Sequence, residues 1–335
     1  RADTTADPLT ALLAHSPPAT QTALQCGLLD SVISALRQVH LSLLVQTSST
    51  DKLKKNNPLV SEMVSYLTLL TSFLYGSDSV KSAAAQLGLA DTVHKVWLWC
   101  QADPLHLTMA LDLLITFTAN CPDAAQTLVL TSTLSGVGQR KVPTSHSLVH
   151  ALVSLLTRER QPLTVRARAL TLLSHCCQAH ECRVVIAKSG LLARWSDQWV
   201  DRRQPLEETE LMWLRFILTF TFFIEGQTSL PKTGELFAQL VQCAESGRTS
   251  SRPLAVAIIR NLAALPANRP RFLSTKSALT LVGEKLLSGS SEEKRDAALI
   301  AWALAANHQK AKVALRGLGL VNRLQLALAT SHDQI

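Results

Sequence analysis

The sequence has few aromatic residues and no long alternating runs of Val, Ile and Thr. Phe, Trp and Tyr make up only 5% of the 335 residues, although hydrophobic residues as a whole make up 47%. Half-buried strands show an alternation of apolar and polar residues, so the lack of this pattern argues against a large sheet. Abundant Ala and Leu with few bulky rings instead favour closely packed helices around a continuous core.

The signs of a secreted or membrane-spanning chain are also missing. The seven cysteines are an odd number without regular spacing or a secretory leader, which favours a reduced, cytoplasmic environment. The longest apolar run, residues 211–224, contains Arg215 and is shorter than the roughly 20 residues that a bilayer crossing needs. We therefore expect a buried helix there and no membrane contact. Because the chain begins at Arg1 rather than Met, we expect a fragment of a longer protein.

No motif of a common catalytic site is present. The sequence lacks a Gly-rich phosphate loop, a G-x-S-x-G elbow and an H-E-x-x-H helix. The segment GVGQRK at 136–141 has two glycines and two cations, but no strand precedes it and no helix follows it. We therefore expect no catalytic residue, no cofactor and no enzyme activity.

One cluster resembles a metal site in composition, the segment HCCQAHEC at 175–182. Zinc favours tetrahedral sets of Cys and His. A structural zinc site, however, usually takes paired ligands from two segments, and no second pair occurs in the sequence. We expect these residues to serve packing and the surface, with no bound metal.

The sequence does contain a pattern that repeats seven times. In each copy an apolar helix position is followed 18 residues later by a small residue and then by an apolar pair. The copies run from Leu9 to Gly27, Leu70 to Gly88, Leu114 to Ser132, Leu172 to Gly190, Phe216 to Gly234, Ile259 to Ser277 and Ala301 to Gly319. A period near 42–44 residues is typical of armadillo and HEAT solenoids. We predict an all-α, armadillo/HEAT-like solenoid of about seven three-helix repeats, forming one array over residues 1–335.

The sixth copy shows the expected unit. A long third helix over 254–265 follows Pro253, and Pro in the first turn of a helix costs no hydrogen bond. Short helices are expected near 270–275 and 279–287, and Glu292 and Glu293 begin the next long helix. Prolines stand at the same place in earlier units, at Pro58, Pro104, Pro162 and Pro205.

Two long spacings between copies indicate insertions. Residues 47–58 and 133–146 are polar and rich in turn formers, so we predict surface loops. If the second helix restarts near Ser147, the period of the repeat is recovered.

Residues 257–279 (AIIRNLAALPANRPRFLSTKSAL) resemble the armadillo repeat. The stretch AWALAANHQKAKVALRGLGL at 301–320 is also similar to the C-terminal end of the rotatin-like proteins, and VHKVWLWC (93–100) and LLITFTANC (113–121) point the same way. These are large armadillo-like proteins of the centriole and ciliary basal body. The resemblance implies a non-catalytic scaffold that binds centriolar assembly factors at the centrosome or basal body.

The sequence departs from the nuclear-import adaptors, which carry a row of Asn and Trp on successive third helices to grip a basic peptide. We call the place of Asn261 in its third helix the ladder position. The other units carry Ala11, Ser72, Thr116, Ser174, Leu218 and Ala303 there, and none has Trp four residues earlier. Import-signal binding is therefore disfavoured.

Charge is unevenly distributed. Residues 1–135 hold seven Lys/Arg and ten Asp/Glu, a net charge of −3, whereas residues 136–335 hold 26 and 15, a net charge of +11. The second half should favour an acidic partner. Tubulin tails and nucleic acid are alternatives, but little aromatic interleaving accompanies the arginines, which disfavours nucleic acid. Trp195, Trp199, Trp213 and Trp302 fall at apolar helix positions and are expected in the core.

These patterns predict a right-handed superhelix whose third helices line a concave groove for an acidic peptide or helix. The residues predicted to contact the partner are Arg166, Ser174, Arg215, Arg260, Asn261 and Lys294. Self-association through apolar faces of terminal repeats is a further alternative.

Overall fold

The computed structural model describes residues 6–48, 57–129, 147–158, 161–201 and 207–332. These residues form 21 α-helices and two short 3₁₀ helices, and no strand occurs among them. The prediction of an all-α solenoid of about seven three-helix repeats is confirmed. Most of the two predicted insertion loops lies outside the described residues, but α9 begins at Leu148 directly after Ser147, as expected for the restart of a second helix.

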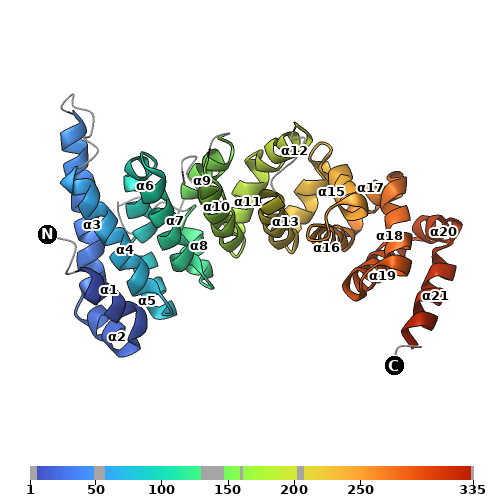
Figure 1. Ribbon diagram of the computed structural model, residues 1–335, viewed down its shortest axis with the longest axis horizontal. Helices are drawn as coiled ribbons and strands as arrows, with labels where there is room; N and C mark the ends of the chain where they lie inside the picture. Colours follow the sequence, from blue (N-terminus) through green and yellow to red (C-terminus); the bar gives the residue numbers. More distant parts are fainter. Residues whose placement is uncertain (1–5, 49–56, 130–146, 159–160, 202–206, 333–335) are drawn as a thin grey trace, which may run out of the picture. The chain divides into compact units, whose positions relative to one another are not determined.

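The helices follow one another in triplets (Figure 1). The third helices are α1 (Ala6–His15), α4 (Pro58–Leu74), α7 (Pro104–Thr118), α10 (Leu163–Cys176), α13 (Glu207–Thr221), α16 (Arg252–Ala263) and α19 (Ser291–Ala305). The first helices are α2 (Pro17–Gln25), α5 (Asp78–Gln86), α8 (Pro122–Thr127), α11 (His180–Lys188), α14 (Ile224–Ser229) with η1 (Leu230–Lys232), α17 (Arg269–Ser274) preceded by η2 (Pro266–Asn268), and α20 (Gln309–Gly317). The second helices are α3 (Leu28–Ser48), α6 (Leu89–Cys100), α9 (Leu148–Leu156), α12 (Leu191–Asp201), α15 (Leu236–Ser246), α18 (Lys276–Ser288) and α21 (Leu320–His332).

The chain forms two compact units, residues 1–186 and 187–335. In the first unit the third helices α1, α4, α7 and α10 pack side by side, and in the second α13, α16 and α19 do the same. Five of the third helices also pack against the second helix that precedes them: α4 against α3, α7 against α6, α10 against α9, α16 against α15 and α19 against α18. Stacked third helices are therefore the shared feature of both units, while one continuous array over 1–335 stays a prediction.

Local sequence signals explain where the third helices begin. Pro58 and Pro104 are the first residues of α4 and α7, and the side chains before them, Asn57 and Asp103, accept hydrogen bonds from backbone N–H groups two residues on. Such caps satisfy donors that a helix leaves unpaired at its start. The start of α19 is held by a capping box, in which the Ser290 hydroxyl and the Glu293 carboxylate each bind the other residue's backbone N–H.

The repeated glycine has a conformational cause. Gly27, Gly88, Gly190, Gly234 and Gly319 all have positive φ, between 41° and 74°. Each lies between a first and a second helix, where the chain turns through the left-handed region that costs other residues about 1–2 kcal/mol. Ser277 is different because it lies inside α18, and Ser132 is outside the described residues.

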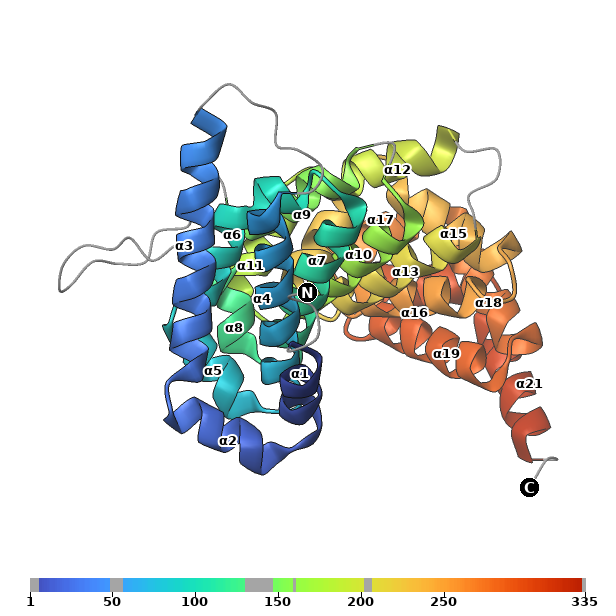
Figure 2. The ribbon, with the colours of Figure 1, turned by 60° about the vertical axis from the view of Figure 1, so that its left-hand side comes forward.

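The apolar run at 211–224 contributes to the core as predicted, since α13 buries Trp213, Phe216 and Phe220. One described helix, α3, is long and apolar enough to cross a membrane by length and composition alone. A third of its apolar window is buried (33%), and α3 packs against α4 and α6 (Figure 2).

The tryptophans divide into two groups. Trp195 and Trp213 are buried and stack with ring centroids 5.2 Å apart, as expected of core residues. Trp302 is 72% exposed, so the prediction that it lies in the core is wrong. The side chain of Trp199 is outside the described part of the chain.

Replacing Gly190 should test the left-handed turn. A Cβ built at Gly190 meets no described atom within 4 Å, so Gly190→Ala should lower the free energy of unfolding by about 1 kcal/mol through backbone strain alone. Gly317 in α20 has equally open surroundings but ordinary φ. Gly317→Ala should therefore raise stability by about 0.5–1 kcal/mol. Urea unfolding of both variants measures the contrast, and equal effects of the two would contradict it.

Candidate protein-interaction surface

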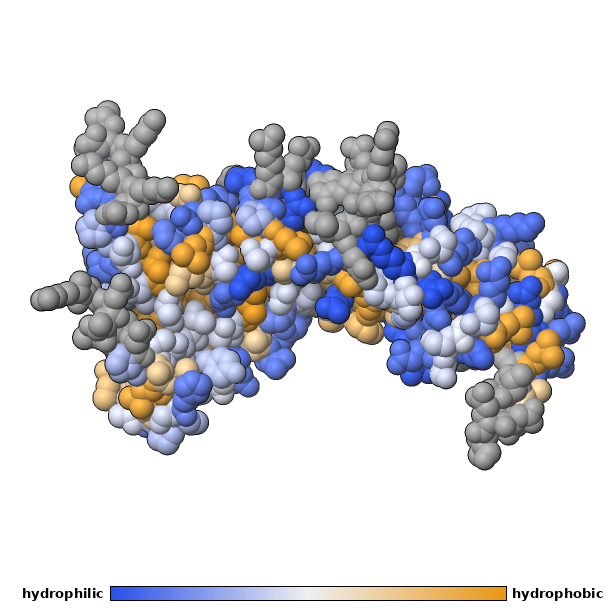
Figure 3. Space-filling model, in the orientation of Figure 1, coloured by the Kyte–Doolittle hydropathy of each residue, from blue (hydrophilic) through white to orange (hydrophobic). Residues whose placement is uncertain are grey.

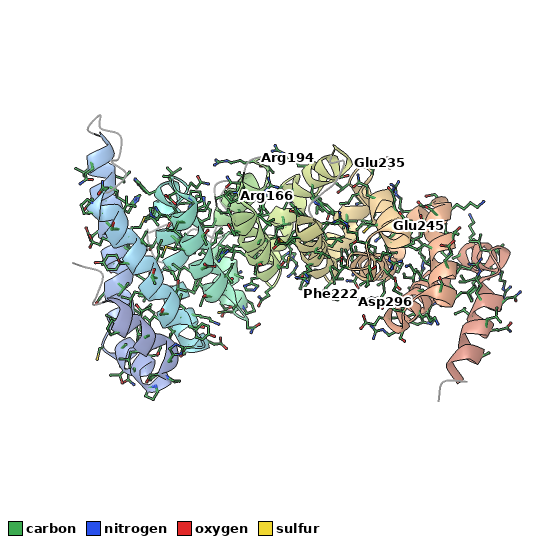
Figure 4. The ribbon with its side chains drawn as sticks, viewed as in Figure 1. Arg166, Arg194, Phe222, Glu235, Glu245 and Asp296 are labelled. Carbon is green, nitrogen blue, oxygen red and sulfur yellow. The ribbon has the colours of Figure 1, made fainter. Side chains whose placement is uncertain are left out.

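The six residues predicted to contact a partner all lie on third helices. Arg166 and Ser174 are on α10 in the first unit, and Arg215, Arg260, Asn261 and Lys294 are on α13, α16 and α19 in the second. Arg215 is exposed, Asn261 is 7% exposed, and the other four are half-buried. Figure 4 labels Arg166 on α10. The structure therefore brings four of them onto three neighbouring helices, but not all with a free side chain.

Arg260 is engaged within the second unit. Its Nη1 donates to Oδ1 of Asp296 on α19 at 2.9 Å, and its Nε and Nη2 donate to Oδ1 of Asn261 at 3.2 and 2.9 Å. The Asp296 side chain is only 7% exposed. Because Asp296 neutralises much of its charge, Arg260 joins α16 to α19 and is a weak candidate for binding an acidic partner.

Asn261 is held on both ends of its amide. Its Oδ1 accepts from Arg260, and its Nδ2 donates to the hydroxyl oxygen of Thr221, in the last turn of α13, at 3.2 Å. The side chain therefore lies between stacked third helices instead of on their open face. The residue that the sequence suggested for peptide capture connects one repeat to the next.

The same contact recurs in the first unit. The hydroxyl of Thr118, in the last turn of α7, lies 3.2 Å from Nδ1 of His175 on α10. Thr118 and Thr221 are both completely buried. In each unit a threonine at the end of one third helix thus meets a polar side chain on the next third helix.

Burial shows that His175 occupies the ladder position of α10. The buried residues of successive third helices correspond in sequence as follows: Leu113, Leu114 and Phe117 of α7; Leu172, Leu173 and Cys176 of α10; Phe216, Ile217 and Phe220 of α13; and Ile258, Ile259 and Leu262 of α16. The ladder residues are therefore His175 and Thr219, and the sequence assignments of Ser174 and Leu218 are one residue off. They are off because the distance from the buried position to the glycine is 17 residues in these two repeats, as from Leu173 to Gly190.

The environment of His175 lowers the pKa of its imidazole below the ordinary value. Burial is the largest cause and the charge of Lys81 acts in the same direction, while a hydrogen bond to the Ile115 carbonyl opposes them. Burial disfavours the charged form of a base. His175 is therefore held in its neutral form, which suits a hydrogen bond inside a stack of helices.

The Cys and His cluster at 175–182 belongs to the packing of the first unit. Cys176, Cys177 and Cys182 are completely buried, and the thiols of Cys177 and Cys182 donate to the carbonyls of Leu173 and Ala125. A hydrogen bond with Cys182 and burial raise the pKa of the Cys176 thiol well above its usual range. In the part of the chain that the structure describes, no group of three or more His, Cys, Asp and Glu residues is placed to hold a metal ion.

Comparison with known proteins agrees with this architecture. No family model matches the chain. It is 27% identical to human (Homo sapiens) rotatin over 336 residues and 26% identical to mouse (Mus musculus) rotatin over 334 residues, in each case over 96% of this chain and 15% of rotatin. The chain thus spans about 15% of the length of the curated relatives it matches.

Solved structures resemble the fold. An engineered protein superposes with a TM-score of 0.68 and 16% identity, covering 95% of this chain and 68% of its own. A designed armadillo repeat protein in complex with the peptide (KR)4 gives 0.59 and 16%, covering 80% and 99%. A computationally designed armadillo repeat protein for modular peptide recognition gives 0.53 and 20%, covering 67% and 87%. The chain therefore has an armadillo-like repeat fold, and its sequence is similar to a region of rotatin.

A double-mutant cycle at Thr221 and Asn261 should measure the contact between α13 and α16. Asn261→Ala leaves Thr221 and Arg260 short of a buried partner, so it should lower the free energy of unfolding by about 1–3 kcal/mol. Thr221→Val should cost less once Asn261 is absent, giving a coupling energy of about 1 kcal/mol by urea unfolding. Strictly additive effects of the two substitutions would show that the hydrogen bond does not stabilise the stack.

The pH dependence of stability should depend on His175. A base whose folded pKa is lowered stabilises the fold above its unfolded pKa, which for histidine is ordinarily near 6.5, and loses that contribution as pH falls through the lower folded pKa. His175→Asn places the residue of the second unit at this position, where it can still bond Thr118. The variant should lose less stability between about pH 7 and pH 5, as urea unfolding would show. An unchanged pH profile would contradict this account.

Proposed function

We propose that this chain is a non-catalytic scaffold for protein–protein interactions and part of a large protein that assembles centrioles or ciliary basal bodies. The observation that carries the proposal is the armadillo-like fold combined with similarity to rotatin over 96% of the chain. Armadillo-type arrays hold partners on a surface built from successive repeats. The proposed location, the centrosome or basal body in the cytoplasm, rests on the resemblance to rotatin-like proteins.

The proposed binding surface is the open face of the third helices. In the second unit this face carries Arg215, the exposed member of the predicted set, and Phe222 just beyond the end of α13, 59% exposed. Lys294 on α19 adds a half-buried cation to the same unit, and in the first unit the third helix α10 carries the half-buried Arg166. Residues 136–335 have a net charge of +11. A peptide or helix that combines acidic and apolar side chains fits this composition.

Internal use of the ladder position supports a partner other than a basic peptide. Asn261 bonds Thr221 on the neighbouring third helix and Arg260 on its own helix, and His175 lies within hydrogen-bond distance of Thr118 on the neighbouring third helix. They therefore do not offer the row of free amides that grips the backbone of an import signal. The designed armadillo protein that binds (KR)4 shares the fold with this chain, whereas the basic half of this chain repels such a ligand.

A second candidate follows from the same excess of positive charge. The basic half could bind an acidic surface such as a tubulin tail or nucleic acid without a specific groove. Binding of that kind weakens steeply with salt because it depends on counterion release. A partner held partly by apolar contacts should lose less affinity when salt is raised.

Charge reversal at matched positions tests the third-helix surface. The partner would be recovered by affinity purification from ciliated, dividing cells and identified. Its affinity for the purified chain and for each variant would then be measured. Arg215→Glu on α13 should weaken its affinity by about tenfold, through repulsion of acidic side chains. Arg194→Glu makes the same charge change at an exposed residue of α12, which lies at the opposite side of the view from Phe222 (Figure 4). This variant should keep the wild-type affinity within about twofold.

Three results would contradict the proposal. Equal affinity of wild type and Arg215→Glu for the partner would show that the third-helix surface does not bind it. Equal losses in both variants, together with a steep salt dependence, would favour the general basic surface. Absence of any centriolar or basal-body protein among the recovered partners would refute the proposed location.

A further inference from the structure

A groove of about 330 Å³ lies between α19, α20 and α21 in the second unit. Eight of the ten residues that line it are apolar, and the other two, Lys312 and Arg316, are exposed cations of α20. The apolar residues are Ala298, Ala301, Trp302, Ala305, Leu315, Leu320, Val321 and Leu324. Figure 3 shows hydrophobic surface over α20 and α21 beside hydrophilic surface. An apolar floor with a cationic edge is therefore open to solvent.

The groove repeats a face that is covered in the preceding repeat. Forty-two residues earlier stand, in the same order, Val256, Ile259, Ala263, Leu279 and Val282, which correspond to Ala298, Ala301, Ala305, Val321 and Leu324. All five earlier residues are at most 4% exposed, and α19 packs against both of the helices that carry them. Of their counterparts in the groove, Val321 is 45% exposed, Ala298, Ala305 and Leu324 are half-buried, and Ala301 is 4% exposed. Trp302, at the place of Arg260 in the preceding repeat, is 72% exposed. The groove thus has the form of a surface built to receive a helix.

The way in which α19 covers α16 and α18 shows what such a helix needs. It contributes buried apolar residues, among them Ala297, Ile300 and Leu304. It also carries two buried carboxylates: Glu293 accepts from Lys285 of α18 at 2.8 Å, and Asp296 accepts from Arg260 of α16 at 2.9 Å. In this unit, α19 thus covers α16 and α18 with an apolar ridge and with carboxylates that pair with their cations. A helix that covers the groove needs the same two features.

Charge selects the occupant of the groove. From residue 309 to 332, across α20 and α21, the sequence holds four Lys and Arg and no Asp or Glu. A second copy of the chain placed face to face would bring two such cationic patches together without a carboxylate from α20 or α21 to pair with them, which is unfavourable. A helix with carboxylates beside its apolar ridge would pair with them instead.

We propose that the groove between α19, α20 and α21 binds an amphipathic helix with acidic flanks that belongs to another protein. The apolar ridge would cover Trp302, Val321 and Leu324, and the carboxylates would face Lys312 and Arg316. This is a helix-in-groove mode of recognition. It is independent of the third-helix surface and of the centriolar role proposed above.

Two synthetic peptides provide the probe. Both are helices of about 18 residues with the same Leu ridge at i, i+3, i+4 and i+7, one flanked by Glu and the other by Lys, each with a fluorescent label. Fluorescence anisotropy with the full 335-residue chain measures their affinities. The Glu peptide should bind at least about tenfold more tightly than the Lys peptide.

Variants locate the binding. Lys312→Glu/Arg316→Glu should weaken the Glu peptide about tenfold, and Trp302→Ala should weaken it several-fold through lost apolar contact. Lys232→Glu/Lys276→Glu changes two exposed cations outside the groove by the same charge and should bind like wild type. Circular dichroism checks that every variant keeps its helices. These substitutions are at exposed positions, so the fold should be retained.

Several outcomes would overturn the inference. Equal affinity for the two peptides would show that charge does not select the occupant. Unchanged binding by Lys312→Glu/Arg316→Glu and Trp302→Ala would place the peptide elsewhere. Sedimentation that shows a dimer of the chain, abolished by Trp302→Ala, would assign the groove to a second copy.

Discussion

The stack of third helices depends on a buried hydrogen bond that crosses from one repeat to the next. Thr118 meets His175 between α7 and α10, and Thr221 meets Asn261 between α13 and α16. Apolar side chains supply most of the contact between these helices, but such contacts alone tolerate small changes of register. A buried polar group without its partner costs about 1–3 kcal/mol, so the bond favours one register. In both units the residue at the ladder position therefore has a structural role, because it joins two neighbouring third helices.

This internal use shapes what the protein can recognise. Asn261 and its neighbour Arg260 are tied to Thr221 and Asp296, so the proposed open face of the second unit keeps Arg215, Phe222 and Lys294. Arg215 and Phe222 have no counterpart of the same type in the next repeat, where Ala257 and Ala264 stand. We therefore expect binding specificity to come from side chains that differ between repeats, on helices whose arrangement repeats. The armadillo fold provides the frame, and its presence in proteins that bind peptides does not determine the ligand here.

The repeat could be predicted from the sequence because its signals have local causes. The glycines mark left-handed turns, the prolines mark helix starts, and the period marks the spacing of stacked units. The register of α10 and α13 could not be predicted, since the turn from the third helix to the glycine is one residue shorter there and the apolar pattern allows either choice. A threonine among apolar residues in the last turn, as at Thr118 and Thr221, was the available signal. Trp302 was misjudged for another reason: an apolar helix position reveals which face is apolar, not whether a neighbour covers it.

The two proposed surfaces of the second unit differ in how much apolar area surrounds their cations. On the third helices of the second unit, Arg215 is exposed and remains hydrated, so salt screens its attraction for a partner. In the groove of α19, α20 and α21, cations border an apolar floor, and a helix that covers the floor also removes water from Lys312 and Arg316. Desolvation strengthens a matched charge pair and penalises a mismatched one. We therefore expect the proposed groove to be the more selective of the two proposed surfaces, although both should favour acidic ligands.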